Sequence, residues 1–250
     1  MPVLDLEPAA REIKELINGV SDDRLGGPTP CDMPLAALLD HLMGLSRAFT
    51  DAAHKTNSDE SRAEVPPPSA DRLDPDWRNQ LPERLDQLVD AWRAPAAWDG
   101  TTQAGGITMP ADQMGVVALD ELVLHGWDLA RATGQTFHAD EASTAAILSF
   151  TTEMAKPEYD DQREGLFGPV VDVANDASDL GRALGFAGRD PAWMPQMAPH
   201  EGTNVAPGPS GGIAPLADAS PGPGPSGGVS QRPPIASNAG EPTDVARARA

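Results

Sequence analysis

Two residues of the kind that bind metals or transfer protons, Glu121 and His125, lie four apart in the segment DELVLHGWDLARATGQ, residues 120–135. In an α-helix four residues advance by one turn plus about 40°, so the two side chains share a face. The same face carries the apolar residues Met114, Val117, Ala118 and Leu129. The spacing therefore predicts a carboxylate and an imidazole on the core side of a helix.

A third candidate ligand, His41, shares a helical face with Leu38 and Leu45. Two histidines and one glutamate from facing helices form the ligand set of an open, catalytic type of zinc site. Two alternatives remain: a local Glu121–His125 contact within one helix, and a core histidine at position 41 that binds no metal. The metal-site hypothesis is favoured because burying an unpaired carboxylate costs free energy, and a cation bound to it would offset that cost.

Two further residues are secondary candidates. Asp128, three residues after His125, is placed to accept the second N–H of a ligating histidine, or else to pair with Arg131 at the surface. Cys31 precedes the helix of His41, where it is either a reactive thiol or a small core residue.

The elements that must position these residues are helices, because apolar residues recur at three- and four-residue steps. Asp32, Asp74 and Asp140 are predicted N-caps, and Gly134 is a predicted C-terminal cap. The predicted helices cover residues 4–20, 34–54, 74–92, 110–133, 140–154 and 178–186. This pattern predicts an all-α fold, an antiparallel four-helix bundle with a small C-terminal helical addition. A helical domain of different connectivity is the alternative.

Composition changes sharply near Pro199, and residues 199–250 are rich in proline and glycine with few large side chains. The hexapeptide PGPSGG occurs twice there, at 207–212 and 223–228. Such a segment buries too little apolar area to offset its ordering entropy. We therefore expect one helical domain over residues 1–198 and a disordered tail over residues 199–250.

The net charge of −20 disfavours binding to nucleic acids or anionic membranes. The single cysteine, Cys31, excludes an intrachain disulfide and a metal site built from several cysteines. The N-terminal residues lack the pattern of a signal peptide, and no segment has the length and apolarity of a spanning helix. We therefore expect a cytoplasmic protein.

Several short motifs identify a resemblance to a known family. They are TPC at 29–31, LLDHLMG at 38–44, LDPDWR at 73–78, LVLHGWDLARATGQ at 122–135, FGP at 167–169, DASDL at 176–180 and GRDPAW at 188–193. In this order they resemble the DinB-like metal-binding proteins of actinobacteria, which are related to the N-terminal domain of mycothiol-dependent maleylpyruvate isomerase. In this family a tryptophan usually follows TPC, whereas this sequence has Met33 in that region.

The resemblance implies a four-helix bundle that holds a divalent metal, zinc in the isomerase, through His41, Glu121 and His125. It also implies that the metal positions and activates the sulfur of mycothiol, a small thiol cosubstrate, for attack on an unsaturated acid. A bound cation lowers the pKa of a thiol and holds the nucleophilic thiolate.

Three functions follow as hypotheses. The first is a metal-dependent isomerase or thiol S-transferase that uses mycothiol and a small electrophile. The second is a non-catalytic metal-binding or partner-binding bundle, and the third is a metal-free domain in which Glu121 and His125 are structural. The substrate and the oligomeric state stay open, as does the metal, because this ligand set also accepts nickel, iron or manganese.

Overall fold

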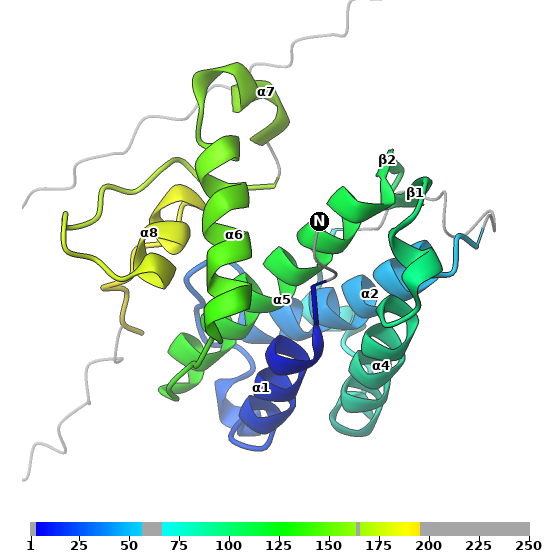
Figure 1. The fold of residues 1–250 in the computed structure, drawn as a ribbon. Helices are drawn as coiled ribbons and strands as arrows, with labels where there is room; N and C mark the ends of the chain where they lie inside the picture. Colours follow the sequence, from blue (N-terminus) through cyan, green and yellow to red (C-terminus); the bar gives the residue numbers. More distant parts are fainter. Residues whose placement is uncertain (1–3, 57–66, 164–165, 196–250) are drawn as a thin grey trace, which may run out of the picture. The chain divides into compact units, whose positions relative to one another are not determined.

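The computed structural model describes residues 4–56, 67–163 and 166–195, and it is mainly helical (Figure 1). Its α-helices are α1 (Glu7–Ile17), α2 (Leu35–Ala53), α4 (Trp77–Trp92), α5 (Ala111–Thr133), α6 (Glu141–Met154), α7 (Asp160–Arg163) and α8 (Asp179–Phe186). Short 3-10 turns cover Asp22–Arg24, Ala70–Arg72, Pro95–Trp98 and Pro157–Tyr159. The predicted tail, residues 199–250, lies outside the described residues. The predicted all-α class is confirmed.

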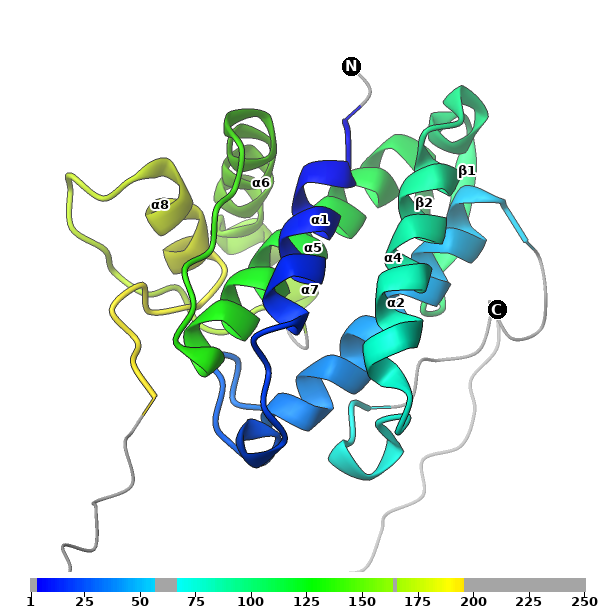
Figure 2. The same ribbon diagram turned by 90° about the horizontal axis from the view of Figure 1, so that it is seen from below.

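Helices α1, α2, α4 and α5 share one apolar core. Helix α2 packs against α4 and α5, and α1 packs against the same two helices (Figure 2). The side chains that meet between them are almost fully buried and include Ile13, Leu38, Leu42, Leu85 and Leu119. Burying such side chains stabilises the fold by about 1.5–3 kcal/mol each. The packing of α2 on α5 brings the helix of His41 against the helix of Glu121 and His125.

The start of α2 differs from the prediction that Asp32 caps it. The N-cap is Pro34, and Asp32 lies in a turn with a φ of 59°. The first N–H groups of α2 are already bound, because Leu35 N donates to the Gly27 carbonyl and Ala36 N to the Leu25 carbonyl. Backbone carbonyls from a loop that folds back therefore replace the expected side-chain cap.

The start of α4 also differs, since its N-cap is Asp76 and its first residue is Trp77. Asp74 instead accepts a hydrogen bond from Asp76 N through Oδ1, which forms a turn ahead of the helix. Pro82 lies inside α4.

A β-hairpin with its turn at Gly105 and Gly106 precedes α5. Strand β1 (Thr101–Ala104) pairs antiparallel with β2 (Ile107–Pro110), with Ala104 opposite Ile107. Both glycines have positive φ, 55° and 81°, which suits a two-residue hairpin turn. A Gly-Gly pair between two four-residue strands is the sequence signal that would have predicted it.

The C-terminal addition consists of α6, which packs on α5, and α8, which packs on α6. Helix α8 begins after Ser178, whose Oγ accepts from Gly181 N, and it has the predicted extent. The following backbone turns at Gly188, where φ is 79° and an added Cβ would lie 2.6 Å from the backbone of Gly168. Only glycine fits this close approach. The turn brings Arg189 back to α5, where it pairs with Asp128.

The start of α6 provides a test of the fold. Asp140 Oδ1 accepts from the N–H groups of Ala142 and Ser143, both at 3.0 Å. We expect Asp140→Ala to lower the free energy of unfolding by about 1 kcal/mol, because two N–H groups lose their acceptor. Urea unfolding followed by circular dichroism measures this. Asp140→Asn keeps the cap and is the matched control, and equal stability of the wild type and the alanine variant would contradict the assignment.

Candidate metal centre

The three predicted ligands converge where α2 crosses α5. Glu121 Oε2 lies 3.0 Å from His125 Nε2 and 3.8 Å from His41 Nε2. One ligand atom from each of the three residues lies within 4.8 Å of the other two. Ligand atoms around a tetrahedral zinc ion lie about 3.4 Å apart. The spacing and chemistry of the three side chains thus fit a single divalent cation.

The orientation of the two imidazoles supports this fit. Their ring centroids are 4.9 Å apart and their planes meet at 85°. The His125 side chain is 6% exposed, whereas His41 and Glu121 are 20% and 21% exposed. The centre therefore has a closed side at His125 and an accessible side at His41 and Glu121. An accessible side is what a centre needs if it is to take a further ligand.

The ionisation of Glu121 favours cation binding, whereas at His125 a metal has to compete with a proton. Burial raises the pKa of Glu121, but hydrogen bonds from His125 and His41 outweigh burial and hold the pKa well below its ordinary value. Burial lowers the pKa of His125, yet its bonds to Asp128, Cys31 and Glu121 raise that pKa well above the usual value. The metal-free site therefore holds an ionised carboxylate beside a protonated imidazole, and a metal would displace that proton.

Asp128 lies directly behind His125. Its Oδ2 is 3.0 Å from His125 Nδ1 and 3.2 Å from Arg189 Nη2, and its side chain is fully buried. A proton on Nδ1 that is donated to Asp128 leaves Nε2 facing Glu121. Asp128 thus has the position predicted for a carboxylate that orients a ligating histidine. The alternative, a surface pair with Arg131, is not formed, because Arg131 donates to the Trp193 carbonyl instead.

Cys31 is half-buried and lies at the same centre. The structure brings Cys31, His125 and Asp128 within 4.8 Å of one another at their ligand atoms. Thr29 Oγ1 donates to the Met33 carbonyl at 2.8 Å and lies 3.1 Å from Cys31 Sγ, so its oxygen can accept from the thiol. Met33, which stands near the usual tryptophan position, lines the cavity beside Cys31.

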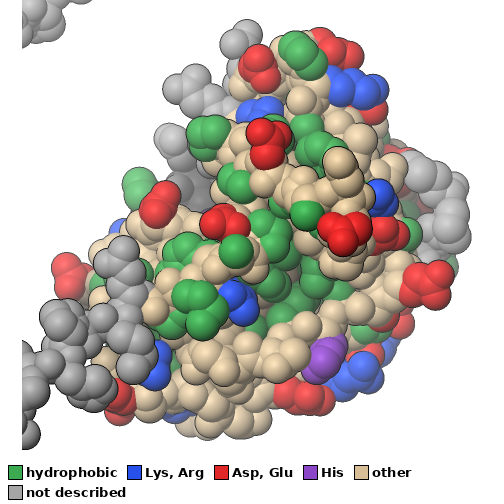
Figure 3. Space-filling model, turned by 90° about the vertical axis from the view of Figure 1, so that its left-hand side faces the viewer, with side chains coloured by type: hydrophobic (Ala, Val, Ile, Leu, Met, Phe, Trp, Pro, Cys, Tyr) green, Lys and Arg blue, Asp and Glu red, His purple; other side chains and the backbone are tan. Residues whose placement is uncertain are grey.

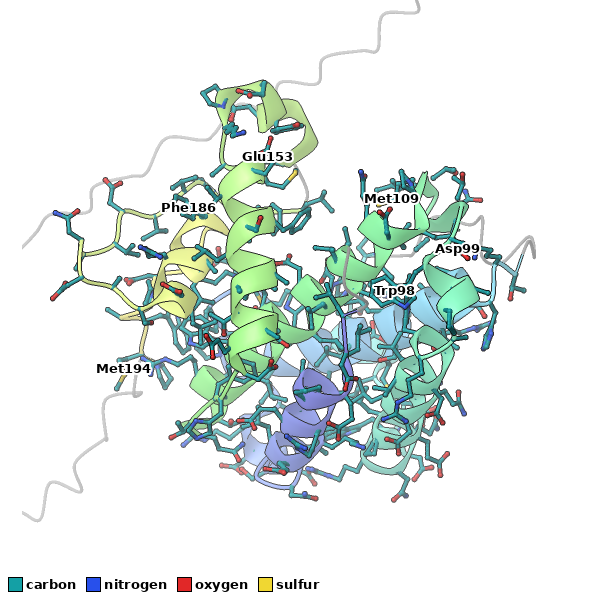
Figure 4. All side chains as sticks on the ribbon, in the orientation of Figure 1. Trp98, Asp99, Met109, Glu153, Phe186 and Met194 are labelled. Carbon is teal, nitrogen blue, oxygen red and sulfur yellow. The ribbon has the colours of Figure 1, made fainter. Side chains whose placement is uncertain are left out.

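A cavity of about 1700 Å³ opens from the centre. Its wall includes His41, Glu121 and His125, with apolar side chains from several elements. Figure 4 shows Trp98, Asp99 and Met109 on one side and Glu153 of α6 on the other, all of which line the cavity. On the face drawn in Figure 3, hydrophobic side chains gather toward the middle and acidic side chains are spread around them. The cavity is larger than the 300–1,000 Å³ typical of small-molecule sites, so there is room for a ligand beside the centre.

Two residues at the centre, Arg189 and Asp120, were missed by the sequence reasoning, which named Cys31 as a candidate but did not place it beside His125. Arg189 stands 61 residues after Asp128, and no local spacing links the two. The closeness of Cys31 to His125 likewise depends on the loop before α2. Asp120 is 2% exposed and lines the cavity next to Glu121. Its position in the stripe of Val117 and Leu124 was the signal that could have found it.

The fold and the centre define a helical protein with a candidate two-histidine, one-glutamate metal site beside a large cavity. Residues 6–130, half of the chain, match the family described as the mycothiol maleylpyruvate isomerase N-terminal domain. The chain therefore belongs to this family, and the predicted resemblance is confirmed.

Other comparisons add two findings. No match is found among curated proteins. Among solved structures, a crystal structure of a histidine-to-alanine variant of mycothiol-dependent maleylpyruvate isomerase is similar, with 19% identity and a TM-score of 0.47. The similarity covers 59% of this chain and 66% of that one.

The buried Asp128–Arg189 pair gives a prediction. We expect Asp128→Asn and Arg189→Met each to lower the free energy of unfolding by about 3 kcal/mol, because each leaves a buried charge without its partner. The double variant should be more stable than the sum of the two losses implies, by about 1–3 kcal/mol. Urea unfolding of the four proteins measures this coupling.

The exposed pair Asp179–Arg182 on α8 is the matched control, with its atoms 2.7 Å apart. A double-mutant cycle on this exposed pair should give a coupling energy of less than about 1 kcal/mol. Additive losses for Asp128 and Arg189 would show that the buried pair does not join the C-terminal segment to α5.

Proposed function

We propose that this protein binds one divalent cation, zinc, through His41, Glu121 and His125. The observation that carries the proposal is the convergence of three ligand atoms within 4.8 Å on the wall of a large cavity. Zinc accepts imidazole nitrogen and carboxylate oxygen together, and three protein ligands leave a fourth position for a small molecule.

The residues around the ligands have defined roles in this proposal. Asp128 holds the Nδ1 proton of His125 and so keeps Nε2 directed at the centre. Arg189 neutralises the buried charge of Asp128. Glu121 supplies the negative charge that the cation needs. When bound, the cation would supply a positive charge that stabilises a thiolate.

We further propose that the small molecule is a thiol, mycothiol, and that the protein acts as an isomerase or S-transferase toward a small electrophile. The family's name supports mycothiol, and the cavity's size is consistent with a ligand of that kind. A cytoplasmic location is part of the proposal, since the unpaired Cys31 suits a reducing compartment. No helix among the described residues is long and apolar enough to cross a membrane.

The second candidate function is a metal-binding bundle without thiol chemistry. The observation that favours it is that the candidate ligands come from two helices, His41 from α2 and the others from α5. A cation held by them would link the two helices, which stabilises a fold without any reaction.

Metal analysis tests the ligand assignment. We expect the purified wild type to retain about one zinc ion per chain after desalting, with three ligands and an oriented His125. His41→Ala and His125→Ala should lose the metal while circular dichroism still shows a helical fold. His138→Ala, which changes an exposed histidine outside the centre, is the control and should keep its zinc.

Two results would count against the assignment. Retention of zinc by both alanine variants would show that other residues bind it. A wild type that takes up no divalent metal would exclude both candidate functions.

A thiol-binding experiment separates the two candidates. We expect mycothiol at 100 times its Kd to stabilise the zinc-loaded protein by about 2.7 kcal/mol, which appears as a rise in melting temperature. S-methyl mycothiol, which cannot form a thiolate, is the control and should give little or no shift. If mycothiol causes no shift and is not joined to electrophiles by the protein, the thiol function fails and the metal-binding function stands.

A further inference from the structure

Asp120 is a buried carboxyl group that the proposed metal centre does not use. Its residue is 2% exposed, and its Oδ1 has no hydrogen-bond partner among the described residues. The side chain lies on the cavity-lining stripe of α5 with Val117 and Leu124, one residue before Glu121. Asp120 thus stands at the wall of the cavity, next to a candidate ligand.

A buried carboxyl oxygen is unfavourable unless a hydrogen-bond donor reaches it. A buried polar atom without a hydrogen bond costs about 1–3 kcal/mol, and native proteins leave few of them. Burial raises the pKa of Asp120 well above its usual value, and the nearby charge of Glu121 raises it further. In either protonation state the group keeps an oxygen that can accept a hydrogen bond. Because Asp120 lines the cavity, a donor located there would satisfy this oxygen.

The charges around the cavity determine which kind of ligand can carry that hydrogen-bond donor. Asp32, Asp99, Asp112 and Glu153 line the cavity together with Asp120 and Glu121. Among the described lining residues, the lysine and arginine class is represented by Arg189, which is paired with Asp128 and donates to the Ala187 carbonyl. Acidic ligands would meet like charges here, whereas hydroxyl and ammonium groups would meet acceptors.

We propose that Asp120 is a ligand-binding residue that accepts a hydrogen bond from a hydroxyl or amine of the thiol bound at the metal centre, and so selects for thiols that carry such a donor. The inference rests on the proposed function and deepens it, because it assigns the chemistry of the ligand beyond its sulfur.

Four small thiols of similar size test the proposal on the zinc-loaded full chain. Cysteamine carries an ammonium, 2-mercaptoethanol a hydroxyl, 1-propanethiol a methyl group and mercaptoacetate a carboxylate. We measure the Kd of each by calorimetry, after the zinc content has been determined. We expect cysteamine and 2-mercaptoethanol to bind about tenfold or more tightly than 1-propanethiol, and mercaptoacetate to bind most weakly.

Two substitutions identify Asp120 as the source of the preference. Asp120→Leu should bring the Kd values of 2-mercaptoethanol and 1-propanethiol within about threefold of each other, and it should raise the melting temperature of the metal-free protein by removing an unsatisfied group. Asp120→Asn should keep the preference for 2-mercaptoethanol over 1-propanethiol, because its amide oxygen still accepts. Asp112→Asn changes another carboxyl group of the same helix at the cavity wall and should change neither result.

The outcomes separate this inference from the proposed function. A preference that survives in Asp120→Leu comes from chelation by zinc and overturns the role of Asp120, and so does a lowered melting temperature with unchanged preferences, which indicates a structural role. Equal binding of the four thiols to the wild type also overturns it while leaving the metal centre intact. A wild type that binds neither zinc nor thiol overturns both proposals.

Discussion

The buried carboxylate of Asp128 needs two positively polarised partners, and the arrangement of the centre depends on this need. His125 supplies one through Nδ1, and Arg189 supplies the other from the segment after α8. Neither partner can be withdrawn without leaving a charge in the interior. The interaction fixes the ring of His125 and connects the C-terminal addition to α5. Asp128 therefore positions both the metal-ligand candidate His125 and the part of the cavity wall formed by Gly188 and Arg189.

A concentration of acidic groups beside this support shapes the chemistry of the cavity. Asp120 and Glu121 are neighbours on α5, and further carboxylates line the opening. A metal-free interior would hold these charges at a cost in stability, since like charges in a poorly solvated site repel each other. A divalent cation and a donor-rich ligand would offset that cost. The same acidic residues thus lower the free energy of unfolding of the metal-free protein and favour the binding of a cation.

The predictable parts of the fold were those with local causes. Asp140 begins α6 through hydrogen bonds to the next few residues, and Gly134 ends α5 through its left-handed backbone angles. Both caps were predicted correctly. The prediction that Asp32 caps α2 was wrong, because the first N–H groups of the helix donate to the carbonyls of Leu25 and Gly27, across a loop. Arg189 was missed for the same reason, since its partner lies on another element.

For the candidate centre, the sequence by itself determined that Glu121, His125 and Asp128 lie close together, because helical periodicity sets the neighbours of a residue on its own helix. Only the tertiary structure decided that His41 joins them and that Asp128 pairs with Arg189 rather than Arg131. It also decided that Asp120 Oδ1 is buried with no hydrogen-bond partner among the described residues. Those outcomes depend on which helices pack together and at what depth. Packing is a property of the whole core, which no local spacing specifies.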